Sequence, residues 1–137
     1  MQTKFRNIII LVLCLFAVLF SFSAWVGDDT YITMRVVDNF VHGYGLTWNT
    51  DERVQVFTHP LWMFLLIGAY VVIKEPFLTI VAISIFTALL SVALFLFQVP
   101  KTIPALVLSI ILLGLSKSFM DFSISGLENP LTHLLLI

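Results

Sequence analysis

The sequence predicts an all-α integral membrane protein, and three observations lead to this fold class. Hydrophobic residues make up 60% of the 137 residues and charged residues only 11%, whereas a soluble domain usually carries about 25% charged residues. Residues 8–26 are uncharged and long enough to cross a bilayer, which takes about 20 apolar residues in a helix. Two further apolar runs, at residues 77–99 and 103–119, predict a second and a third span.

The first span sets the expected orientation. Lys4 and Arg6 precede it, and basic residues before a first span favour a cytoplasmic N-terminus. A signal peptide cut after residues 21–23 is the alternative interpretation of the same segment. In both cases Asp28 emerges on the outer face of the membrane.

A polar loop over residues 27–76 follows, and its first part predicts a surface helix at about residues 30–42. Asp29 is the expected N-terminal cap, and Gly43 is expected to end the helix in a left-handed turn. A helix of this kind lies along the membrane surface with its apolar side inward. The predicted apolar stripe consists of Ile32, Val36, Val37, Phe40 and Val41.

The later part of this loop predicts a second short helix, at about residues 60–73, with Thr58 near its cap and Pro60 in its first turn. Its apolar part, residues 61–73, reaches only about 20 Å as a helix. A bilayer core is about 30 Å thick. We therefore expect an interfacial or re-entrant helix instead of a span.

The number of spans decides whether two polar segments lie on the same side of the membrane. If residues 60–73 do not cross, the loop at 27–76 and the polar stretch at 120–129 share the outer side. If they cross, residues 120–129 move to the cytoplasm, and the lysine distribution leans slightly that way. We give more weight to the short length of residues 61–73 and therefore expect that they do not cross.

A fourth apolar segment starts at Pro130 and is too short to span a bilayer. We therefore expect the chain to be the N-terminal piece of a larger protein, and to be inactive alone.

Several kinds of chemistry are not predicted. Cys14 is the only cysteine, so no intrachain disulfide or thiol-based metal site is expected. His42, His59 and His133 are far apart and form no zinc-binding pattern. The sequence also contains no Gly-rich phosphate loop, no nucleophile elbow and no basic, aromatic surface that would bind nucleic acid.

Asp28 and Asp29 are the candidate catalytic residues. Acids at this position can simply flank a span and cap a helix, which is the plain alternative. A helix N-terminus favours an ionised carboxylate, and partial burial at the membrane surface would leave that carboxylate weakly solvated. Such a group suits a general base, or a ligand for a substrate hydroxyl or a metal. We expect Asp28 to be the base and Asp29 to support it.

Arg35, His59 and Glu128 are candidate substrate-binding residues. Arg35 can bind a phosphate with two parallel hydrogen bonds, or pair with Asp38 one turn on. His59 can contact a phosphate, or serve only as a polar anchor. Glu128 is a second candidate acid, although it can merely complement the dipole of the helix that begins at Pro130.

The first loop carries an extended pattern of polar and aromatic residues, namely Asp28-Asp29-Thr30-Tyr31-Ile32, Arg35, Asn39, His42-Gly43-Tyr44-Gly45-Leu46, Asn49, Glu52-Arg53-Val54 and Thr58-His59-Pro60-Leu61-Trp62. This pattern resembles the first outer loop of GT-C glycosyltransferases, nearest to the mycobacterial arabinofuranosyltransferase-like branch and its bacterial relatives. Ser125-Gly126-Leu127-Glu128 resembles their second acidic motif. His59 departs from the asparagine usual there, which leaves its role open.

The resemblance implies the N-terminal part of a GT-C transmembrane bundle, with juxtamembrane helices in the first outer loop. It implies inverting transfer of a sugar from a polyprenyl-phosphate donor to a glycan, lipid or protein acceptor, outside a bacterial inner (plasma) membrane. Asp28, with Asp29 beside it, would be the catalytic acid. Whether a divalent cation serves as a cofactor is left undecided, and no residues are assigned as its ligands. The alternative function is a non-catalytic polytopic membrane subunit or a component of a lipid-linked transporter.

Overall fold

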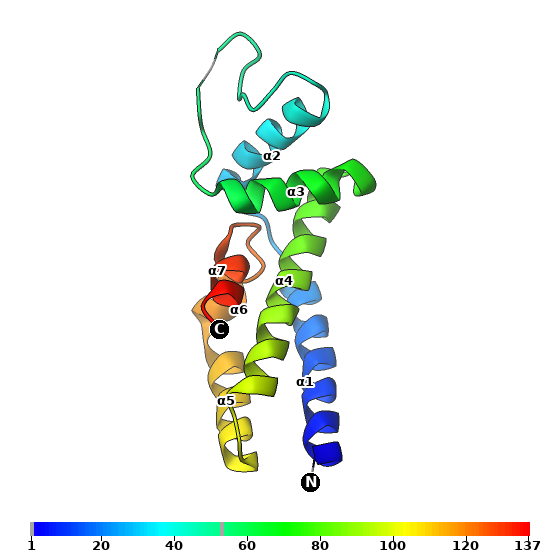
Figure 1. The fold of residues 1–137 in the computed structure, drawn as a ribbon, viewed down its shortest axis with the longest axis vertical. Helices are drawn as coiled ribbons and strands as arrows, with labels where there is room; N and C mark the ends of the chain where they lie inside the picture. Colours follow the sequence, from blue (N-terminus) through cyan, green and yellow to red (C-terminus); the bar gives the residue numbers. More distant parts are fainter. Residues whose placement is uncertain (1, 53) are drawn as a thin grey trace.

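A computed structural model describes residues 2–52 and 54–137, and within them the chain forms seven helices and no strand. Met1 and Arg53 lie outside the described residues. An all-helical fold is thus confirmed for the described part of the chain (Figure 1). The helices are α1 (Gln2–Ser23), α2 (Asp28–Val41), α3 (Pro60–Ile73), α4 (Pro76–Gln98), α5 (Ile103–Leu115), α6 (Lys117–Phe122) and α7 (Asn129–Leu135).

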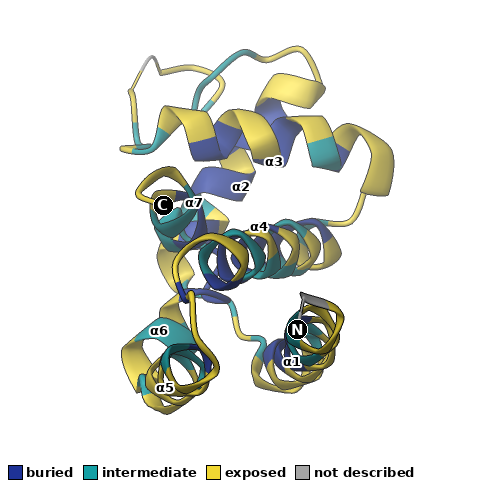
Figure 2. Ribbon diagram, turned by 60° about the horizontal axis from the view of Figure 1, so that its bottom comes forward, coloured by how far each residue is buried: buried dark blue, intermediate teal, exposed yellow. Residues whose placement is uncertain are grey.

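Three helices, α1, α4 and α5, run along the long axis of the molecule, and we call them the stem (Figure 1). Among the described residues, two helical segments are long and apolar enough to cross a membrane, namely Thr3–Ser23 with 21 residues and α4 with 23. Much of the stem ribbon is coloured as exposed (Figure 2). The exposed residues of these helices include large apolar ones such as Leu11, Phe22, Phe86 and Leu112. Large exposed apolar surfaces typically contact a membrane or another protein.

The predicted third span is not one continuous helix. α5 ends at Leu115 and α6 begins at Lys117, with Ser116 in an extended conformation between them (ψ 96°). The Ser116 hydroxyl oxygen accepts a hydrogen bond from the Phe119 backbone N–H at 3.3 Å. A serine that caps the next helix in this way competes with continuation of the previous one. The prediction of a single helix over residues 103–119 is therefore wrong.

The start of α2 also differs from the prediction. Gly27 is the N-cap residue, no side chain caps the helix, and Asp28 and Asp29 both lie in the first turn. The predicted cap by Asp29 is therefore wrong. The cause is a tether: the Gly27 N–H donates to the Ser125 carbonyl oxygen at 3.0 Å, and Gly27 is extended with ψ 151°. The helix begins directly after that tether.

The end of α2 is as predicted. Gly43 has a left-handed φ of 85°, and its N–H donates to the Phe40 carbonyl oxygen at 3.1 Å. The Tyr44 N–H donates to the Asn39 carbonyl oxygen at 2.9 Å. This pair of hydrogen bonds is the Schellman motif, in which glycine is favoured because it adopts positive φ without steric cost.

The buried face of α2 is more polar than the predicted stripe. Val36 and Val37 are buried, but Phe40 and Val41 are 40% and 38% exposed. In their place, three polar side chains are buried, namely Thr30, Thr33 and Asn39. The Asn39 amide donates to two carbonyl oxygens of the following loop, at 2.8 and 2.9 Å. The buried polar groups thus have specific partners, as burial requires.

α3 lies across the end of α4 instead of alongside it (Figure 1). Lys74 follows α3 with a left-handed φ of 59°, and the Glu75 carboxylate then accepts hydrogen bonds from the first N–H groups of α4. The Tyr70 hydroxyl donates to the Asp38 carboxylate at 2.8 Å, which joins α3 to α2. That hydrogen bond raises the pKa of Tyr70. We call α2, α3 and residues 123–128 the head.

Two apolar clusters hold the head and the stem. The head cluster is built mainly from α2 and α3 and includes Val37, Trp62 and Leu66. The stem cluster is built mainly from α1 and α4 and includes Phe16, Phe20 and Leu96. Each cluster also contains one buried residue from the other region. Ile80 of α4 belongs to the head cluster, and Ile124 belongs to the stem cluster. The two regions therefore interlock at residues 123–128.

Candidate functional site

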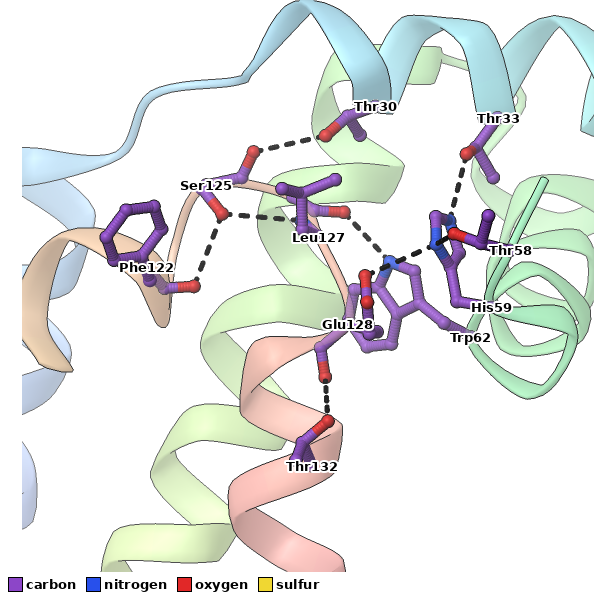
Figure 3. Close-up of polar contacts among 11 residues, drawn as sticks. Thr30, Thr33, Thr58, His59, Trp62, Phe122, Ser125, Leu127, Glu128 and Thr132 are labelled. Carbon is purple, nitrogen blue, oxygen red and sulfur yellow. Dashed lines mark hydrogen bonds and ion pairs between the residues drawn. The ribbon is translucent and has the colours of Figure 1, made fainter. Parts of the chain in front are cut away.

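Residues 123–128 are where three distant segments of the chain meet (Figure 3). The Ser125 carbonyl oxygen accepts hydrogen bonds from the Gly27 N–H at 3.0 Å and from the Thr30 hydroxyl at 3.2 Å. The Trp62 indole N–H donates to the Gly126 carbonyl oxygen at 2.8 Å. These bonds bring the polar segments at 27–76 and 120–129 to the same end of the molecule.

Gly126 allows this close approach. Its φ is 88°, and a Cβ atom there would lie 2.6 Å from Ile80 Cγ2 and 2.7 Å from Thr30 Cγ2. A side chain is therefore excluded both by backbone conformation and by contact with α2 and α4. The structure thus explains why the Ser125–Glu128 motif has glycine at position 126.

His59 and Glu128 come together at this junction. His59 Nδ1 lies 3.3 Å from Glu128 Oε2, and the two side chains are 12% and 41% exposed. His59 Nε2 lies 3.0 Å from the Thr33 hydroxyl oxygen. The histidine is the N-cap residue of α3, so the start of that helix points its ring toward both α2 and residues 123–128 (Figure 3).

A pocket of about 310 Å³ opens beside these side chains. Three of the residues singled out from the sequence line it: Asp29, His59 and Glu128. Asp28 and Asp29 are both exposed in the first turn of α2, without the partial burial that was expected, and Asp28 is not among the lining residues. The remaining lining residues are Ile32, Thr33, Val56, Thr58 and Leu127.

Arg35 lies away from this pocket. Its Nε–H donates to the Trp48 carbonyl oxygen at 3.1 Å, and its guanidinium carbon lies 5.2 Å from the centre of the Trp48 ring. The alternative pairing with Asp38 is not among the ion pairs of the described residues, and Asp38 instead accepts from Tyr70 and lies near His42. Phosphate binding by Arg35 stays a prediction.

Two residues of the site were missed from the sequence, Thr33 and Trp62. Thr33 lies one helical turn after Asp29, and residues four apart share a face of a helix. That spacing could have linked it to the catalytic candidates. Trp62 was noted only as part of the loop pattern, and nothing local indicates that its indole reaches Gly126, 64 residues away.

The pocket combines two carboxylates with an imidazole, among both hydroxyl-bearing and apolar side chains. Both acids can accept hydrogen bonds from substrate hydroxyls, and Asp29 lies in the first turn of α2, where the helix dipole favours a negative charge. Within the described residues, no group of three or more histidine, cysteine or acidic side chains is arranged to hold a metal ion. Hydroxyl recognition and proton transfer are the chemistry that these groups offer directly.

No protein-family model, no curated protein and no solved structure matches this chain. The function proposed next therefore rests on the residues and the geometry described above.

Proposed function

We propose that the chain is part of a GT-C type glycosyltransferase. It moves a sugar from a polyprenyl-phosphate donor to a glycan, lipid or protein acceptor of the cell envelope. The observation that carries the proposal is the convergence of Asp29, His59 and Glu128 on one pocket, from segments up to 99 positions apart in the sequence. The motifs that resemble those enzymes contain these same residues.

The proposed site of the reaction is the outer face of a bacterial inner membrane crossed several times by the chain. All eight acidic residues fall between positions 28 and 75 or between 121 and 128, that is, in or beside the head. Lys4, Arg6 and Lys101 lie at the opposite end of the stem, where α1 begins and α4 meets α5 (Figure 1). Arg35, Lys74 and Lys117 lie in or beside the head, so the basic residues are divided between the two ends. The proposed orientation therefore rests on Lys4 and Arg6, because basic residues before a first span favour a cytoplasmic N-terminus.

In the proposed reaction, an acceptor hydroxyl attacks the anomeric carbon of the donor sugar. The new C–O bond forms as the bond to the polyprenyl phosphate breaks, and the bonding electron pair leaves with the phosphate. Asp29 accepts the hydroxyl proton during the attack, because a carboxylate is too weak a base to remove it beforehand. Attack opposite the leaving group inverts the anomeric centre.

Asp29 replaces Asp28 as the preferred base because Asp29 lines the pocket. Asp28 supports the site through its charge in the same first turn. Glu128, which also lines the pocket, binds and orients sugar hydroxyls.

The test compares two matched substitutions in the intact protein in lipid nanodiscs, Asp29→Asn and Asp28→Asn. Both remove one charge from the first turn of α2. Release of polyprenyl phosphate from a panel of polyprenyl-phosphate sugars is measured with cell-envelope acceptors present. We expect Asp29→Asn to lower turnover at least about 100-fold, as loss of a general base does, and Asp28→Asn to lower it by less.

The opposite ranking would assign the base to Asp28. If neither substitution lowers turnover, the catalytic base does not lie in the first turn of α2. If the unaltered protein consumes no donor, the enzyme proposal is wrong. The chain would then be a non-catalytic membrane subunit or a transporter component. The internally bonded His59 would in that case serve only to join the head to residues 123–128.

A further inference from the structure

A second cavity, of about 380 Å³, lies in the loop between α2 and α3. This loop projects from the head on the side away from the stem (Figure 1). The cavity is lined by residues 44–47 and by three of residues 54–57. None of the described residues that line it carries a charged side chain. We call it the loop cavity, and we call the pocket beside His59 the site pocket.

A short stretch of chain, residues 55–58, separates the loop cavity from the site pocket. Gln55 and Phe57 line the loop cavity, whereas Val56 and Thr58 line the site pocket. Such alternation is typical of an extended chain, whose successive side chains point to opposite sides. A single extended chain takes up a width of about 5 Å. A ligand that is a chain of several small units can therefore pass over residues 55–58 and occupy both places.

The loop cavity combines an aromatic ring with polar groups. Tyr44 is 62% exposed, and its backbone is fixed to the end of α2 by the hydrogen bond to Asn39. The Gln55 side-chain N–H donates to the Phe57 carbonyl oxygen at 3.1 Å, and within the described residues this amide has no other hydrogen bond. The Thr47 hydroxyl is buried without a partner among those residues. Buried hydroxyls are normally hydrogen-bonded, so the cavity offers polar groups that a ligand can satisfy.

A sugar unit matches the chemistry of the loop cavity. Its ring carries C–H groups that pack against an aromatic face, and its edge carries hydroxyls that bond amides and other hydroxyls. A lipid chain fits poorly, because the cavity lies on the side away from the stem, two of whose helices are long and apolar enough to cross a membrane (Figure 1). A glycan in water reaches this side of the molecule directly.

We infer that the loop cavity binds a sugar unit of the acceptor, which is therefore a glycan chain of several units. The terminal unit places its reacting hydroxyl in the site pocket, and the chain passes over residues 55–58 so that an earlier unit lies against Tyr44. This assignment of the acceptor rests on the proposed transferase function. Binding of a glycan in the loop cavity does not, because it needs neither donor nor transfer.

The first test varies the length of the acceptor with the intact protein in nanodiscs. The acceptors are size-sorted fragments of one to four sugar units, cut from the envelope glycans of the cells that make the protein. We expect kcat/KM for the acceptor to rise at least about 10-fold from one unit to four, as gain of one aromatic contact allows. Equal kcat/KM at all lengths, or transfer only to lipid or peptide acceptors, would overturn the inference.

Substitutions at Tyr44 test where the added units bind. Tyr44→Ala should lower kcat/KM for four-unit acceptors about 10-fold, through KM for the acceptor, and leave one-unit acceptors unaffected. Tyr44→Phe keeps the ring face and should keep the preference for long acceptors. Tyr31→Ala is the control, since Tyr31 is 47% exposed and lines neither the loop cavity nor the site pocket. It should leave the ratio between long and short acceptors unchanged. An unchanged ratio in Tyr44→Ala would overturn the inference.

Binding without donor separates this inference from the proposed function. Saturation-transfer NMR titrations with the four-unit fragments should show binding to the unaltered protein and binding about 10-fold weaker to Tyr44→Ala. If the unaltered protein transfers no sugar, the proposed function fails, and these titrations still decide whether the loop cavity binds a glycan. If transfer occurs but neither acceptor length nor Tyr44 affects it, the proposed function stands and this inference fails.

Discussion

The head and the stem are each stabilised by a different kind of interaction. In the head, hydrogen bonds join residues that are far apart in sequence, such as Trp62 with Gly126 and Thr30 with Ser125. In the stem, side-chain hydroxyls bond to their own helix, as Ser21 does to Ala17 and Thr87 to Ile83. Contacts between the stem helices come from an apolar cluster. Polar contacts of fixed geometry are thus concentrated where the candidate chemistry lies.

The difference has a physical basis. Apolar packing depends on shape and area and tolerates substitutions of similar volume. A buried hydrogen bond depends on both partners, and loss of one leaves the other unsatisfied at a cost of about 1–3 kcal/mol. The head should therefore be sensitive to single-atom changes that the stem would tolerate. Two substitutions test this sensitivity.

The largest effect is expected for Gly126→Ala. The new Cβ would clash with Ile80 and Thr30 at less than 3 Å, at a residue with left-handed φ. A left-handed conformation costs a non-glycine residue roughly 1–2 kcal/mol, and overpacking adds about 1–3 kcal/mol. The thermal-unfolding midpoint should fall sharply, and the side chains that line the pocket should be displaced together.

Gly45→Ala is the control for that experiment. Gly45 has the same left-handed φ of 88°, but nothing lies within 4 Å of the Cβ position. It should therefore show only the conformational cost of roughly 1–2 kcal/mol. Equal shifts in the unfolding midpoint for the two alanine variants would contradict the tight contact at residues 123–128.

A smaller effect is expected for Trp62→Phe, with Trp25→Phe as its counterpart. Both indoles donate to carbonyl oxygens in the segment from 121 to 126, but Trp62 is 1% exposed and Trp25 is 45% exposed. Losing the buried donor should cost about 1–3 kcal/mol. Losing the exposed one should cost about 0.5 kcal/mol or less, because water replaces it. Similar destabilisation of both variants, measured by thermal unfolding, would contradict the expected difference between the buried and the exposed hydrogen bond.

Much of the helical fold could be predicted because its signals are local. Pro60 lies at the start of α3, Pro76 at the start of α4 and Gly43 just past the end of α2. Proline in a first turn and glycine after a last turn act through their own backbone geometry. These boundaries need no knowledge of the rest of the chain.

Other features could not be predicted because they depend on distant contacts or on a weak local signal. Gly27 becomes the N-cap of α2 only because Ser125 holds its N–H. Ser116 divides an apolar run in which Gly114, in the last turn of α5, is the nearest glycine. The approach of Thr33 to His59, 26 residues apart, follows from how α2 and α3 pack. A single sequence carries periodicity and capping signals, but not the pairing of segments.

In the proposed arrangement, the segment from 27 to 76 and the segment from 120 to 129 form one outward-facing site. The most direct measurement is labelling of single cysteines in intact cells with a membrane-impermeant maleimide, in a Cys14→Ser background. Cysteines replace Asp51 in the loop between α2 and α3, Asp121 beside residues 123–128 and Lys101 at the far end of the stem. We predict that positions 51 and 121 react from outside and that position 101 reacts only after permeabilisation. Labelling of 121 together with 101, and not with 51, would contradict the shared site.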